Sequence, residues 1–183
     1  MIATRRAVML GATALVPLAM AGCATGPLTP AQIVTEAQAV ASGLAGMLKS
    51  VTAQYPTLIP ASTAATIAAD LTLAQSAATT LSSAMPAATA ASTVKTVEGY
   101  VNAVLTTLAG PPINGLIPAP FNMVVSAAAF VLPQLEAFAA TYIPALAASP
   151  ASASAQRLFL ASAPPIADTA LAVSILQRAA AGK

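Results

Sequence analysis

The sequence predicts an all-α fold, a four- to five-helix up-and-down bundle rich in alanine. Apolar residues recur at alternating spacings of four and three residues in three consecutive segments, a pattern typical of helices that pack through one face. Alanine, the strongest helix former, is the most frequent residue. Prolines separate these segments, as expected for residues that interrupt helices.

The first predicted helix begins at Pro30 and ends before Tyr55-Pro56. Thr29 is expected to cap it, with Pro30 in the first helical position and Gln32 placed to complete a capping box. The apolar seam of this helix consists of Ile33, Ala37, Val40, Leu44, Met47 and Val51.

The next two predicted helices repeat the same spacing. One starts near Pro60 and stops at Pro86, and the other runs from Ala87 to Ala109. The seam of the first is Ile67, Leu71, Ala74, Ala78, Leu81 and Met85. The seam of the second is Ala90, Val94, Val97, Val101, Val104 and Leu108. Short connections favour antiparallel neighbours.

A proline-rich loop over residues 110–120 precedes a fourth helical segment, from Phe121 to about Leu146. Its apolar positions are Phe121, Val124, Ala128, Val131, Leu135, Phe138 and Tyr142. Pro133 is expected to kink or split this helix, and Pro144 to do so near its end.

A membrane span within residues 113–147 is an alternative for this segment, because no charge occurs between Glu98 and Glu136. The continuous apolar stretch runs only from Met123 to Leu132, and a span needs roughly 20 apolar residues. The length therefore favours a core helix over a transmembrane or interfacial one.

The last predicted helix begins after Pro164-Pro165. Its apolar positions are Ile166, Ala170, Val173 and either Leu176 or Ile175. Asp168 near the start and Arg178 near the end match the helix dipole. The expected organisation is a signal peptide (1–22), a lipidated tether (23–28), a helical bundle (29–147), an Ala/Ser/Pro linker (148–163) and a C-terminal helix (164–183).

The first 22 residues have the composition of a signal peptide. Arg5 and Arg6 form a short basic segment, and an uncharged apolar stretch follows that is too short to span a bilayer comfortably. The stretch ends in Met20, Ala21, Gly22 and Cys23.

These four residues resemble the bacterial lipobox, usually Leu-Ala-Gly-Cys, with Met20 in place of the preferred Leu. The resemblance implies a diacylglycerol on the Cys23 thiol, cleavage before Cys23 and acylation of the new amino group. The alternative is an ordinary secretory signal with an incidental cysteine. Under the lipobox interpretation, the lipid on Cys23 rather than a spanning helix makes the membrane contact.

The segment around Arg5 and Arg6 also resembles a twin-arginine export motif in part, although Val8 and Met9 stand where that motif favours Phe and Leu. The general secretory route is the alternative. Ala24 follows Cys23, whereas Asp at that place commonly signals retention at the inner membrane in such lipoproteins. The resemblance therefore implies the periplasmic face of the outer membrane if the host is Gram-negative.

The charge content limits the partners that this chain can bind. Charged residues make up 7% of the sequence, against about 25% in typical soluble domains. The whole chain has 7 Lys and Arg and 5 Asp and Glu, and removal of residues 1–22 takes away Arg5 and Arg6 but no acid. The near-neutral remainder lacks the basic patch of a nucleic-acid binder. Its weakly charged surface favours self-association or an envelope protein partner.

The residue inventory predicts a protein that is not an enzyme. It contains no histidine, and its single cysteine is assigned to the lipid. The five carboxylates lie in five segments, with no local spacing that places two on one helix face, although they could meet in space. No catalytic residue, metal site or cofactor is predicted.

The remaining distinctive residues are given structural roles. Glu36 is expected to be a surface charge that matches the helix dipole, and Lys95 and Glu98 a solvated pair. Gly43 and Gly46 are expected to permit a close helix crossing.

The expected function is a non-enzymatic, membrane-anchored envelope lipoprotein that acts as a structural or interaction module. The mature part is similar in style to uncharacterised alanine-rich lipoproteins of bacterial prophage regions, which implies the alternative of a membrane-active or lysis-associated protein working through residues 113–147. A second alternative is a binder of a hydrophobic small molecule inside the bundle, which would require the helices to splay.

Overall fold

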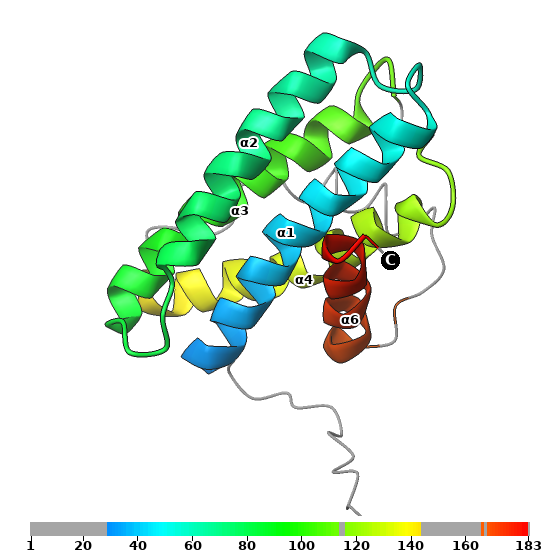
Figure 1. Cartoon of the computed structure of the whole chain (residues 1–183). Coiled ribbons are helices and arrows are strands. Elements are labelled where there is room, and N and C mark those ends of the chain that lie inside the picture. Colours follow the sequence, from blue (N-terminus) through cyan, green and yellow to red (C-terminus); the bar gives the residue numbers. More distant parts are fainter. Residues whose placement is uncertain (1–28, 114–115, 144–165, 167, 183) are drawn as a thin grey trace, which may run out of the picture.

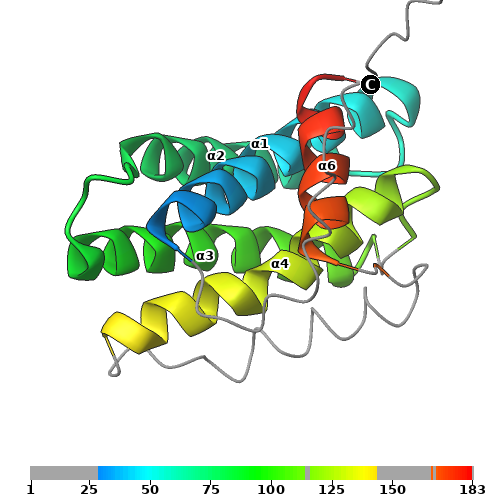
Figure 2. The ribbon, with the colours of Figure 1, turned by 90° about the horizontal axis from the view of Figure 1, so that it is seen from below.

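The computed structural model describes residues 29–113, 116–143, 166 and 168–182. Within them the chain is all-α and forms no strand, which confirms the predicted fold class. The helices are α1 (Pro30–Gln54), α2 (Ala61–Thr80), α3 (Ala87–Ala109), α4 (Phe121–Tyr142) and α6 (Thr169–Ala180). Helices α1 to α4 run up and down, and α6 lies across α1 and α4 (Figures 1 and 2).

The start of α1 has the predicted capping box. The backbone N–H of Gln32 donates to Thr29 Oγ1, and the backbone N–H of Thr29 donates to Gln32 Oε1 at 2.9 Å. Pro30 occupies the first helical position. These two hydrogen bonds satisfy N–H groups that a helix start otherwise leaves unpaired.

The three predicted seams form the centre of the core. Every seam residue of α1 and α3 is buried, as are those of α2 except Met85, which is partly buried. Helix α3 packs between α2 and α4 and also contacts α1. Its buried surface is therefore wider than the seam and includes Ala91, Glu98 and Leu105.

Helix α2 ends earlier than predicted, at Thr80 rather than at Pro86. The hydroxyls of Thr79 and Thr80 donate to the backbone carbonyls of Ser76 and Ala77, and Ser82 Oγ accepts from the backbone N–H of Ala84. Such local side-chain hydrogen bonds compete with helix continuation. Leu81 remains buried although it lies outside the helix.

Pro133 was predicted to kink or split this helix, and the split does not occur, because α4 is continuous through Pro133. Pro133 is exposed, whereas Val131, Leu132 and Leu135 are fully buried. The proline ring thus faces solvent, and core packing on the opposite side holds both halves in one helix. The helix ends at Tyr142, since Ile143 precedes Pro144 and is disfavoured in the α conformation.

Helix α4 is a core helix of the bundle. It is the one described helix with the length and hydropathy of a membrane span, yet most of its apolar stretch is buried among the other helices. The loop before it also contributes to the core, because Ile113 and Ile117 are almost fully buried. The loop prediction for residues 110–120 is confirmed for its described part.

Helix α6 packs into the bundle rather than standing apart from it. Asp168 is its N-cap, accepting from the backbone N–H of Leu171 at 2.7 Å. The side-chain amide of Gln134 on α4 donates to Thr169 Oγ1 at 2.8 Å. The buried face is Ala172, Ile175 and Leu176, so the predicted inclusion of Ala170, which is exposed, is wrong. The face is shifted because α6 contacts two helices at once.

The close crossing predicted for the α1 glycines is confirmed. A Cβ on Gly43 would lie 2.8 Å from the carbonyl oxygen of Leu176 and 2.9 Å from its Cα, and a Cβ on Gly46 would overlap the carbonyl oxygen of Ala179. The backbones of α1 and α6 therefore approach too closely for any side chain at either position. The linker predicted for residues 148–163 lies outside the described residues.

Candidate functional site

The residues of the predicted export and lipidation motifs precede the described part of the chain, which starts at Thr29. They are Arg5, Arg6, Met20, Ala21, Gly22 and Cys23. Their roles stay predictions from the sequence. The described residues contain further features with chemical character: a pair of neighbouring carboxyl groups, a separate buried glutamate and two cavities.

The Lys95–Glu98 pair is not the solvated pair that the sequence predicted. Glu98 is 2% exposed and Lys95 is 26% exposed. Lys95 Nζ lies 2.9 Å from each carboxylate oxygen of Glu98, and the side-chain amide of Asn102 is 3.4 Å from Glu98 Oε1. The ion pair is therefore anchored in the bundle at its carboxylate end.

Glu98 on α3 also meets Glu136 on α4, so two of the scattered carboxyl groups do come together in space. Burial raises the pKa of Glu98, Lys95 lowers it, and the neighbouring Glu136 raises it. Glu136 Oε1 is buried and has no hydrogen-bond partner among the described residues. No three His, Cys, Asp or Glu side chains gather there in a way that could hold a metal ion.

Removal of Lys95 leaves the Glu98 carboxylate without its cation. We expect Lys95→Met to lower the free energy of unfolding by about 1 kcal/mol at pH 8. The effect is modest because solvent around the partly exposed lysine weakens the ion pair. The loss should be smaller at pH 5, because a lower pH favours the protonated form of Glu98, which no longer needs the cation. Urea unfolding at both pH values measures it. Lys49→Met on the exposed face of α1 is the control, and an equal loss in both variants would contradict this assignment.

Glu36 was also predicted to be a surface charge, and the structure buries it. It is 5% exposed, and its Oε2 is buried with no hydrogen-bond partner among the described residues. Burial raises the pKa of Glu36 from 4.5 to about 7. The side chain is thus partly protonated at neutral pH, since the carboxylate form is poorly solvated.

The burial of Glu36 and Glu98 could have been suspected from the heptads. Each residue directly flanks a seam position: Glu36 precedes Ala37, and Glu98 follows Val97. Flanking positions are solvated in a two-helix coiled coil but become buried when a helix has several neighbours. The number of neighbours is a property of the tertiary fold, which the periodicity alone does not give.

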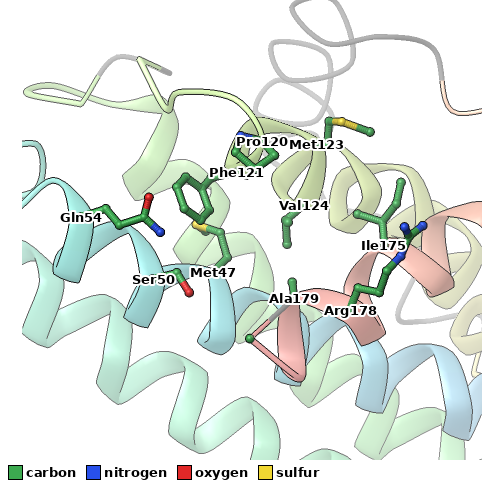
Figure 3. A pocket seen from close by; sticks show the side chains of 11 residues that line it. Met47, Ser50, Gln54, Pro120, Phe121, Met123, Val124, Ile175, Arg178 and Ala179 are labelled. Carbon is green, nitrogen blue, oxygen red and sulfur yellow. The ribbon is translucent and has the colours of Figure 1, made fainter.

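An apolar cavity of about 370 Å³ lies where α6 crosses the end of α1 and the start of α4. Its lining is Met47, Ser50, Gln54, Pro120, Phe121, Met123, Val124, Ile175, Arg178, Ala179 and Gly182. In Figure 3 Met47, Phe121 and Val124 turn toward a common space, with Ile175 and Arg178 on one side and Gln54 on the other. The rings of Tyr55 and Phe121 pack edge to face, with centroids 6.3 Å apart.

This cavity was missed by sequence reasoning because its residues come from three segments far apart in the chain. Arg178 lines it from the last turn of α6 and is exposed, and its guanidinium donates to Ser174 at 3.4 Å. No carboxylate of the described residues forms an ion pair with Arg178. Among the described residues, the lining has no acidic side chain and combines apolar walls with the positive charge of Arg178.

A second cavity of about 580 Å³ lies in the groove between α1 and α2. Alanines form much of its wall, together with Leu48, Ile59 and Leu71, and Lys49 is the charged residue among the described residues that line it. It is bounded by two helices and their connection, whereas three helices enclose the cavity beside Arg178.

Comparisons with protein families, curated proteins and solved structures give no match to this chain.

Proposed function

We propose that this protein is an exported, lipid-anchored lipoprotein of the bacterial cell envelope that acts as a non-enzymatic structural or interaction module. The observation that carries the proposal is the lipobox-like segment from Met20 to Cys23, placed directly before a folded helical bundle. Residues 23–28 would span at most about 20 Å when extended. The bundle would thus be held close to the membrane surface.

The position of α4 supports an anchor outside the bundle. The helix that could span a membrane by length and composition has most of its apolar surface buried in the core. Its insertion into lipid would require the bundle to open. This favours a lipid anchor at Cys23 over the alternative in which residues 113–147 act on membranes directly.

The described surface suits contacts with another protein or a second copy. Several large apolar side chains are exposed on it, including Leu116 at 69% and Leu73 at 48%. Sparse charges provide little electrostatic repulsion against association. The partner would be an envelope protein or another molecule of this chain, and no nucleic acid is proposed.

Substitution of Cys23 tests the anchor. We expect Cys23→Ala to move the protein from the membrane fraction to the soluble fraction after a carbonate wash, without loss of helical circular dichroism. Gly22→Ala is the matched control, because lipobox positions before the cysteine accept small residues, and it should remain in the membrane fraction. Retention of Cys23→Ala in washed membranes would contradict the proposal.

Labelling with an alkyne fatty acid separates lipidation from other causes of membrane retention. Cells that express the wild-type chain and Gly22→Ala should incorporate the label into the protein, and Cys23→Ala should not. Equal incorporation into all three chains would place the acyl group elsewhere.

A further inference from the structure

We propose that the cavity between α1, α4 and α6 binds a free fatty acid, with its hydrocarbon chain among the apolar side chains and its carboxylate at Arg178. The inference concerns the described bundle and is independent of the lipid anchor. The proposed site differs in place from the small-molecule site predicted inside the bundle. The seams inside the bundle are filled, whereas the cavity lies where α6 crosses the ends of its neighbours.

The cavity has the size and composition of a small-molecule site. Its volume of about 370 Å³ falls in the range of roughly 300–1,000 Å³ found for ligand pockets, which are mostly apolar with a few polar groups. Met47 and Met123 line it, and their unbranched side chains adapt to an irregular hydrocarbon chain. Met123 is 38% exposed, so the cavity has an apolar approach from solvent.

The charge of the lining selects an anionic ligand. Arg178 forms no ion pair with a described carboxylate, and none of the described residues that line the cavity is acidic. A guanidinium binds a carboxylate through two parallel hydrogen bonds. Ser50 and Gln54 add polar groups that can donate hydrogen bonds at the same cavity. A single hydrocarbon chain with a terminal carboxylate therefore fits both the apolar walls of the cavity and the positive charge of Arg178.

The test uses membranes that contain the wild-type protein, treated with a fatty acid carrying a diazirine on its chain. After irradiation, mass spectrometry should find the label on segments around Met47, Met123 and Ile175. Excess oleate should abolish the labelling. Labelling spread evenly over the exposed helices, or insensitive to oleate, would overturn the proposal.

Two substitutions test the binding of the hydrocarbon chain and of the carboxylate separately. Val124→Trp fills the cavity and should remove the labelling. Arg178→Gln should reduce it about fivefold for the fatty acid probe, from loss of a charge-assisted hydrogen bond, and leave it unchanged for the matching fatty alcohol probe. Lys49→Gln, which removes a positive charge at the other cavity, should have no effect.

Arg178 is exposed, so Arg178→Gln should fold and test the proposal even if Val124→Trp does not fold. Equal labelling of wild type and Arg178→Gln by the acid probe would refute the role of the guanidinium. Stronger labelling of the cavity by a diazirine phospholipid than by the fatty acid would refute the free fatty acid as the occupant.

Discussion

Alanine at both Gly43 and Gly46 is expected to detach α6 from the bundle. Each new Cβ would meet the backbone of α6, at Leu176 and at Ala179, and a backbone cannot move aside as a flexible side chain can. Overpacking at one such site costs about 1–3 kcal/mol. The double variant should therefore lose about 3 kcal/mol in free energy of unfolding, and amide hydrogen exchange in α6 should accelerate most.

Gly99→Ala is the matched control, because it makes the same substitution inside a helix where the new Cβ would have no atom within 4 Å beyond its chain neighbours and the helix's own backbone. It should stabilise the protein by about 0.5–1 kcal/mol through helix propensity alone. If Gly43→Ala/Gly46→Ala behaved like Gly99→Ala, the close crossing of α1 and α6 would be wrong.

Stability is expected to fall as the pH rises from about 4.5 to about 7. The folded-state pKa of Glu36 is raised to about 7 from 4.5, so the folded state binds more protons than the unfolded state in this range. The stabilising effect of a protonated Glu36 is complete below pH 4.5 and lost as the pH passes 7. A shift of this size corresponds to about 3 kcal/mol, and the raised pKa of Glu98 acts in the same direction.

Glu36→Gln should remove most of this pH dependence and unfold at a higher urea concentration than the wild type at pH 8. The expected gain there is about 2 kcal/mol, since a buried amide still lacks full hydrogen bonding. Asp70→Asn, the same charge change on the partly exposed side of α2, is the control and should keep the wild-type slope. A wild-type stability that rises from pH 5 to pH 8 would contradict the buried position of Glu36.

Much of the helical architecture was predictable because it depends on local rules. Proline and capping residues define the starts of α1 and α3, and the four–three spacing identifies the core positions of three helices. The end of α2 was not predictable from Pro86, since hydroxyl groups of Thr79 and Thr80 already satisfy nearby carbonyls. The continuity of α4 through Pro133 depends on which side of the helix faces solvent, a tertiary property.

The candidate sites also include features that local sequence predicts and features that depend on tertiary contacts. Gly43 and Gly46 could be assigned to a close crossing from their spacing, but their partner, α6, lies more than a hundred residues later in the chain. The Glu98–Glu136 contact and the cavity at Arg178 each join residues from separate helices, and no short sequence pattern records such a meeting. Glu36 and Glu98 were misjudged as solvated because the number of packed neighbours was unknown.

The most direct measurement of the central proposal is the amino-terminal chemistry of the mature protein. Mass spectrometry of the protein extracted from membranes should find Cys23 as the first residue, carrying a diacylglycerol on its thiol and an acyl group on its amino nitrogen. Alkaline hydrolysis should release the ester-linked fatty acids. A mature chain that begins elsewhere, or that contains an unmodified Cys23, would contradict the lipid anchor and the envelope role proposed from it.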